Sequence, residues 1–138
     1  PAAPLGKKLR NPVILNAQGA RAYLCLIHLI PTDKPRPAED VQTAYDHFVW
    51  LRTHEMAAKL MSCGPVEPPA PLAPGIWGGG LAVVSAPPAE AKAIAAAEPS
   101  GLAGYRRLVV QGWRMDYGVA APIAQALQTL NWVPKRRR

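Results

Sequence analysis

The chain has 138 residues, enough for one domain with a hydrophobic core and too few for two such domains. Its 16 Lys and Arg against 9 Asp and Glu give a net charge of +7, and the excess lies at the two ends. Residues 22–134 hold eight basic and nine acidic groups. This near-neutral body argues against a broad nucleic-acid-binding face on the domain itself.

The basic ends are the parts that we expect to contact other molecules. An acidic protein, RNA or anionic lipid would each suit them, and solubilising tails are the simpler interpretation. The acid-poor beginning favours a mitochondrial protein, with the cytoplasm as the alternative. The predicted tail contacts are Lys7, Lys8, Arg10, Lys135, Arg136, Arg137 and Arg138.

Two cysteines, Cys25 and Cys63, form neither a metal-binding spacing nor a disulfide framework, which indicates a reducing compartment. The apolar run from Leu24 to Ile30 has only seven residues, so no transmembrane segment is expected. His47 and His54 lie two helical turns apart and cannot chelate one ion as a pair one turn apart would. We therefore predict no metal and no cofactor.

Residues 1–20 are interpreted as a basic N-terminal arm with a short strand at 13–15. Residues 21–30 are apolar on both alternating faces, which is typical of a strand covered on both sides, and so we expect it in the centre of its sheet. A loop dense in proline and charge follows at 31–37.

Residues 38–58 change to helical spacing and carry one apolar stripe. A weakly alternating strand at 59–63 then ends at Gly64 and Pro65, and a stiff proline-rich loop occupies 66–75. Later elements follow in order: a strand at 78–85, a helix at 88–98, a turn at 99–104, a strand at 106–116 and a short helix at 120–130.

This order of strand, helix, strand, strand, helix, strand predicts an α+β domain over 21–118 with a ferredoxin-like βαββαβ arrangement. Both helices would pack on one face of an antiparallel sheet, and 119–138 would form a C-terminal helix and basic tail. The second sheet face would remain apolar and exposed in a monomer. We expect a second copy or another protein to cover it.

His47 is the candidate general base, because imidazole is the side chain suited to proton transfer near neutral pH. Asp46 points about 100° away from it around a helix, and Glu55 lies two turns on. The competing interpretation is that His47 is a hydrogen-bonded helix residue with no catalytic role. The glycines beside Trp77 come before a strand, whereas those of a phosphate-binding loop follow one. We therefore interpret them as the entry to a strand, with Trp77 as a possible pocket wall.

The stretch HFVWLRTHEMAAKLMSCGP, together with AAAEPSGLAGYRRLVVQGW further on, resembles the YCII-related family over roughly residues 21–117. The resemblance implies a ferredoxin-like fold that dimerises through its sheets as a dimeric α+β barrel. It also implies a cleft with a His and Asp dyad, and an enzyme similar to the family removes chloride from a hydroxylated aromatic ring.

Carried onto this chain, the resemblance makes His47 the dyad histidine and places Met56 where the aspartate stands, with Glu55 just before it as a weak substitute. Ala58 stands where a glycine is usual. The pairs Gly64-Pro65 and Glu98-Pro99 match the family's Gly-Pro and acidic-Pro pairs and are candidate binding residues, as is Trp77.

Because Met56 breaks the dyad, we expect a non-catalytic accessory or structural subunit docked in a larger assembly through its basic ends. The first alternative is a small homodimeric enzyme of the lyase, dehydrochlorinase or isomerase type that uses His47 on an aromatic or lactone metabolite. The second alternative is an RNA-associated protein that binds through its tails.

Overall fold

The computed structural model describes residues 22–131. Four strands and four helices occupy this part of the chain. Their bounds are β1 Ala22–Pro31, α3 Val41–Met56, β2 Leu60–Pro65, β3 Gly80–Val84, α4 Pro88–Ala96, α5 Pro99–Leu102, β4 Arg106–Met115 and α6 Ala121–Asn131.

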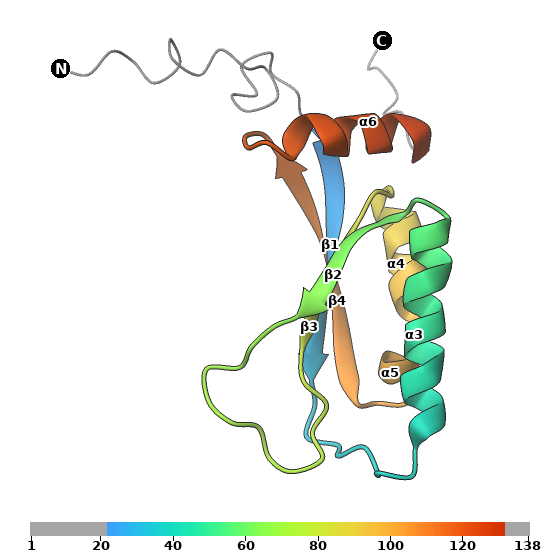
Figure 1. The fold of residues 1–138 in the computed structure, drawn as a ribbon, viewed down its shortest axis with the longest axis vertical. Helices are drawn as coiled ribbons and strands as arrows, with labels where there is room; N and C mark the ends of the chain where they lie inside the picture. The colour runs from blue at the N-terminus through green and yellow to red at the C-terminus, as the bar shows by residue number, and fades with distance from the viewer. Residues whose placement is uncertain (1–21, 132–138) are drawn as a thin grey trace, which may run out of the picture.

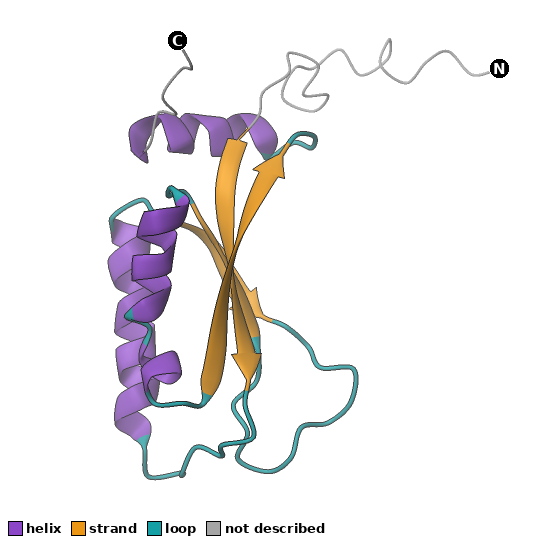
Figure 2. Cartoon of the chain, turned by 180° about the vertical axis from the view of Figure 1, so that it is seen from behind, coloured by secondary structure: helices purple, strands orange, loops and turns teal. Residues whose placement is uncertain are grey.

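The four strands form one antiparallel sheet in the order β2-β3-β1-β4. Helices α3 and α4 lie side by side on one face of it (Figures 1 and 2). This arrangement confirms the predicted α+β class and its ferredoxin-like order. One element differs, because the predicted turn at 99–104 contains the four-residue helix α5.

Strand β1 is central, as its apolar character on both faces predicted. Ile27 pairs with Ala82 of β3 on one side and with Val110 of β4 on the other. The main core lies between β1, β3 and the two helices, and its centre is fully buried. Trp50 of α3 ties the two helices together, since its Nε1–H donates to the carbonyl oxygen of Ile94 in α4 at 3.0 Å.

Helix α3 ends in backbone hydrogen bonds that satisfy its last carbonyls. The N–H of Lys59 donates to the carbonyl of His54, and the N–H of Ala58 donates to that of Glu55. This Schellman pattern requires a left-handed residue after the helix, and Ala58 adopts it with φ of 57°. The chain then turns directly into β2, the strand at the edge of the sheet.

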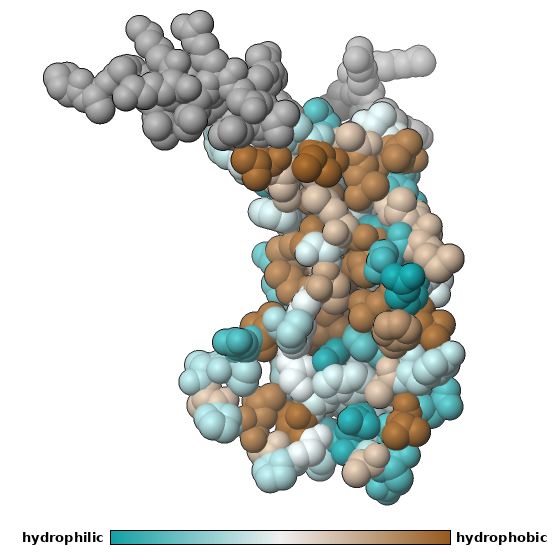
Figure 3. Space-filling model, in the orientation of Figure 1, coloured by the Kyte–Doolittle hydropathy of each residue, from teal (hydrophilic) through white to brown (hydrophobic). Residues whose placement is uncertain are grey.

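The outer face of the sheet, opposite α3 and α4, is covered at one end by α6. Ala22 and Leu24 of β1 pack there against Ala124, and α6 lies across that end in Figure 1. Elsewhere the face remains partly open, and Trp113, which pairs with Leu24, is 41% exposed. Apolar side chains gather along the strands and α6 in Figure 3.

The proline-rich loop between β2 and β3 is anchored at both ends. The N–H of Arg36 donates to the carbonyl of Gly75 at 2.8 Å, and that of Val66 donates to the carbonyl of Gly79 at 3.0 Å. The loop returns Trp77 to the end of the sheet nearest the start of α3. No helix among residues 22–131 is long and apolar enough to cross a membrane.

Candidate active site

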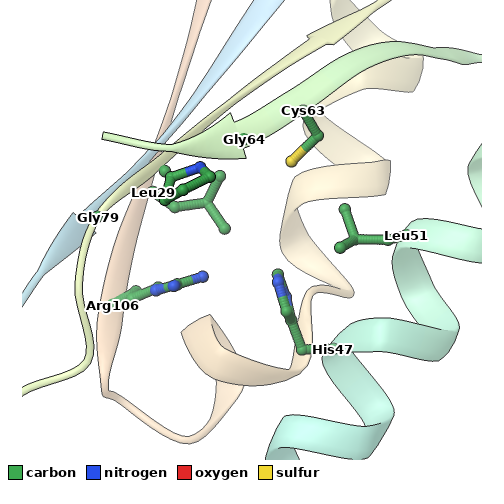
Figure 4. A pocket seen from close by; sticks show the side chains of 9 residues that line it. Leu29, His47, Leu51, Cys63, Gly64, Gly79 and Arg106 are labelled. Carbon is green, nitrogen blue, oxygen red and sulfur yellow. The ribbon is translucent and has the colours of Figure 1, made fainter. Parts of the chain in front are cut away.

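A cavity of about 290 Å³ opens between α3, the edge strand β2 and the first residue of β4. Its walls are mostly apolar or glycine, and the side chains of His47 and Arg106 point into it from opposite elements (Figure 4). The residues that line it are Leu29, His47, Leu51, Cys63, Gly64, Pro65, Gly79, Gly80 and Arg106.

His47 is held by a buried carboxylate. Its Nδ1 lies 2.6 Å from Oε1 of Glu98, and the two side chains are 16% and 0% exposed. An ionised carboxylate only accepts hydrogen bonds, so Nδ1 carries the proton and donates it. In the neutral imidazole the lone pair is then on Nε2, which has no hydrogen-bond partner within residues 22–131. That nitrogen is therefore available to a ligand.

Glu98 stays ionised because of where it sits, at the N-cap of α5. Its Oε1 also accepts from the N–H of Ser100 at 3.0 Å, while Oε2 accepts from the Ser100 hydroxyl at 2.5 Å and the N–H of Gly101 at 2.7 Å. Burial by itself would raise the pKa of Glu98, but the hydrogen bonds from His47, Ser100 and Gly101 outweigh it and lower the pKa below its ordinary value.

Two tryptophans fix the orientation of the His47 ring. Trp50, one turn on along α3, stacks on it with ring centres 6.0 Å apart and planes 20° apart. Trp77 meets it edge-on at 5.4 Å from the loop before β3. With Nδ1 bonded to Glu98 and the two indole rings packed against the imidazole, the ring is held in one orientation.

Arg106 and Cys63 complete the polar part of the lining. Arg106 is only 8% exposed, and burial lowers its pKa although the negative charge of Glu98 opposes this. The Cys63 residue is exposed at the sheet edge, yet loss of water around its sulfur raises the pKa of the thiol. Cys63 is thus an uncharged wall residue rather than an activated nucleophile.

The structure brings together several of the residues selected from the sequence. His47 and Glu98 are in contact, Gly64 and Pro65 line the cavity, and Trp77 packs on His47. Pro99 begins α5 and so places Glu98 at its N-cap, where proline is favoured at the next position.

The predicted position of the acid requires correction. Met56 is 79% exposed, and Glu55 pairs with Arg52 at 2.7 Å on the exposed side of α3. Residues eight and nine positions on are more than two turns along a helix, about 12–14 Å, too far for a hydrogen bond to His47. The carboxylate partner is Glu98, 51 residues later in the chain.

The sequence reasoning missed Arg106, Leu51 and Ser100. A signal existed for Ser100 and its neighbours, since an acidic residue before proline and a small polar residue is a helix-start pattern. For Arg106 the signal was ambiguous, because Arg106 and Arg107 are adjacent and alternate strand positions face opposite sides. Only the register of β4 shows that Arg106 faces the cavity.

The remaining histidines lie away from the cavity. His28 hydrogen-bonds Gln111 at 3.1 Å, and His54 packs edge-on against Trp50 at 5.4 Å. Within residues 22–131, no three His, Cys, Asp or Glu side chains gather closely enough to hold a metal ion. The predicted tail contacts and the strand at 13–15 lie outside the described residues.

Fold and site together define an α+β domain with a ferredoxin-like order and a histidine-carboxylate pair in a small cleft. No protein-family model matches the chain, and no curated protein matches it by sequence. It is similar to the solved structure of 5-chloro-2-hydroxyhydroquinone dehydrochlorinase (TftG) from Burkholderia phenoliruptrix AC1100, in complex with 2,5-dihydroxybenzoquinone. The identity is 21%, the TM-score is 0.47, and the match covers 65% of this chain and 92% of that one. Membership of the YCII-related family stays a prediction.

Proposed function

We propose that the protein is a small acid–base enzyme in which His47 moves a proton on a compact organic substrate bound in the cavity. The observation that carries this proposal is the 2.6 Å hydrogen bond between His47 and the fully buried Glu98, at the wall of a cavity. A solvent-exposed structural histidine would need neither a buried carboxylate nor a fixed tautomer.

The chemistry follows from the arrangement. With Nδ1–H held by Glu98, Nε2 takes a proton from the substrate, and the electron pair left behind forms a double bond or an enolate. The imidazolium that results is stabilised by the carboxylate. It then returns the proton to a departing group or to a neighbouring atom, which corresponds to a lyase or an isomerase. A dehydrochlorinase-like elimination on an aromatic ring, or an isomerisation of a lactone, fits this scheme.

A non-catalytic accessory subunit was expected because Met56 stands at the position of the dyad acid. Glu98 supplies a carboxylate to His47 from another part of the chain, so Met56 no longer speaks against catalysis. What still supports docking in an assembly, or binding of RNA, acidic protein or anionic lipid, is the charge of the two ends. The mitochondrial location likewise remains a proposal from the sequence.

The test is turnover of a panel of chlorinated hydroquinones and unsaturated lactones, followed by absorbance and chloride release. We expect the turnover rate of His47→Gln to fall by about 10²–10⁴-fold. His54 lies on the same helix outside the cavity, so His54→Gln should keep the wild-type rate. Equal activity in wild type and His47→Gln would contradict the proposal. Circular dichroism of each variant separates loss of chemistry from loss of fold.

We also propose that a second copy covers the outer face of the sheet. The support is the partly exposed apolar surface between β4 and β3, including Val109 and Trp113, with the His28–Gln111 pair at its centre. Val109→Asp should convert a dimer to a monomer in sedimentation analysis, and Gln42→Asp on the exposed side of α3 should not. A wild-type monomer at micromolar concentration would refute this.

A further inference from the structure

We infer that Arg106 is an anion-binding residue, and that the cavity takes its ligand as a small organic anion whose carboxylate or other planar oxyanion pairs with the guanidinium. This inference rests on the proposed function in one respect, since it describes the substrate on which His47 would act. Its physical basis is separate from proton transfer, because it depends on the surroundings of Arg106.

Arg106 is a buried cation without a hydrogen-bond or ion-pair partner among residues 22–131. It is 8% exposed, and its Nε, fully removed from solvent, has no hydrogen-bond acceptor. No carboxylate among residues 22–131 forms an ion pair with it. Burying an arginine costs free energy unless hydrogen bonds and an opposite charge compensate, so such groups in native proteins are normally paired. A ligand that brings the missing acceptor would satisfy this requirement.

Glu98 cannot be that acceptor. Its charge attracts Arg106 at a distance, but its two oxygens already accept four hydrogen bonds, from His47, from Gly101 and twice from Ser100. A carboxylate offers about four lone-pair positions. All of them are occupied, and none is left for the guanidinium.

Trp77 holds the guanidinium in place without using its donors. The central carbon of the Arg106 guanidinium lies over the Trp77 ring, 4.4 Å from its centre. A cation-π contact uses none of the guanidinium N–H groups, so they can still form two parallel hydrogen bonds to a carboxylate. Pairing of this kind is the strong geometry for arginine and an oxyanion.

The lining of the cavity favours an anion of modest size. No acidic side chain is among the lining residues, and the other walls are mainly Leu29, Leu51 and glycine. The volume of about 290 Å³ lies at the lower end of the roughly 300–1,000 Å³ typical of ligand pockets. A single ring with one acidic group fits this description. Because Arg106 and His47 point into the same space, the ring would lie beside His47 (Figure 4).

Benzoate and its neutral counterpart benzamide are the probes, titrated into the full chain and followed by the fluorescence of tryptophan and by calorimetry. We expect wild type to bind benzoate at least tenfold more tightly than benzamide. Arg106→Met should abolish this preference, while Arg107→Met, the same change at the exposed next residue of β4, should leave it within twofold. Equal binding of the two probes by wild type, or a preference that survives Arg106→Met, would overturn the inference.

Thermal unfolding gives an independent readout. Since no hydrogen-bond acceptor or carboxylate within residues 22–131 pairs with the Arg106 guanidinium, Arg106→Met should melt at or above the wild-type temperature and should lose the rise in melting temperature that benzoate produces. A large fall in melting temperature, or failure of the variant to fold, would show that Arg106 supports the structure and would count against the inference. His47→Gln should lose turnover and keep benzoate binding, so the two proposals can fail separately.

Discussion

Glu98→Gln tests the central contact of the site with the smallest change in shape. The substitution replaces one carboxylate oxygen by an NH₂ group, which cannot accept a hydrogen bond. If the NH₂ group takes the place of Oε2, the backbone N–H of Gly101 loses its acceptor. If it takes the place of Oε1, the backbone N–H of Ser100 loses its acceptor. Either way one buried backbone donor is orphaned, and the remaining bonds lose their charge.

An orphaned buried donor costs about 1–3 kcal/mol, and a bond to a neutral acceptor is weaker by about 1 kcal/mol than one to a charged acceptor. We therefore expect Glu98→Gln to lower the free energy of unfolding by about 2–4 kcal/mol. Urea unfolding at pH 7 measures it. Glu55→Gln is the matched control, because Glu55 makes only an exposed ion pair with Arg52; it should change stability by less than about 0.5 kcal/mol.

The same variants report on His47 without a substrate. In wild type, the proton on Nδ1 lies in a 2.6 Å hydrogen bond to a carboxylate, and such a proton gives a strongly downfield NMR signal. The signal should move or disappear in Glu98→Gln and stay in place in Glu55→Gln. Similar stabilities and similar spectra for the two variants would refute the pairing on which the site is built.

The pH dependence has a definite sign. The pKa of Glu98 in the folded protein is below its ordinary value of 4.5, so its stabilising contribution is complete above pH 4.5 and is lost as the pH falls through the lower folded value. The stability difference between wild type and Glu98→Gln should therefore be constant near pH 7 and shrink in acid.

Three further predictions concern the frame around the site. Gly101→Ala would place its Cβ 2.6 Å from Cδ1 of Leu108 and should cost about 1–2 kcal/mol in urea unfolding, unlike Gly112→Ala, whose Cβ meets nothing within 4 Å. Ala58→Gly should raise the free energy of unfolding by about 0.5–1 kcal/mol, since Ala58 has a φ of 57° that glycine adopts without strain; a loss of stability would show that this backbone is unstrained. Burial lowers the pKa of His54, an effect that the nearby carboxylate of Glu90 only partly opposes. The contribution of neutral His54 to stability is therefore complete above pH 6.5 and declines below it. Between pH 8 and pH 5.5 the free energy of unfolding should fall more in wild type than in His54→Gln, and an equal fall in the two proteins would contradict this prediction.

Local patterns in the sequence were sufficient for the fold. The strand apolar on both faces became the central strand β1, and the helical spacing after residue 38 became α3, with its ends moved by two or three residues. These features depend on neighbours within about one turn or one strand pair, and residue order alone expresses them. The sequence did not predict helix α5, because four residues are too few to show helical periodicity.

The sequence identified His47 as the candidate base, but it indicated Glu98 only as a candidate binding residue and not as the partner of His47. The residues near His47 in the sequence that were considered for this role are Asp46, Glu55 and Met56, because proximity along the chain is the only distance that a sequence contains. Glu98 reaches His47 because the chain continues through β2, β3 and α4, which Trp50 joins to α3, and because α5, which begins after Glu98, packs against α3. The burial of Arg106 rather than Arg107 depends in the same way on the register between β1 and β4.

The sequence by itself therefore determined the elements other than α5, their order and the candidate base, since each is encoded in local spacing. Tertiary structure alone decided which acid meets that base and which arginine faces the cavity. The physical reason is that a buried hydrogen bond forms between groups that packing brings together, and packing joins residues 51 positions apart as readily as neighbours.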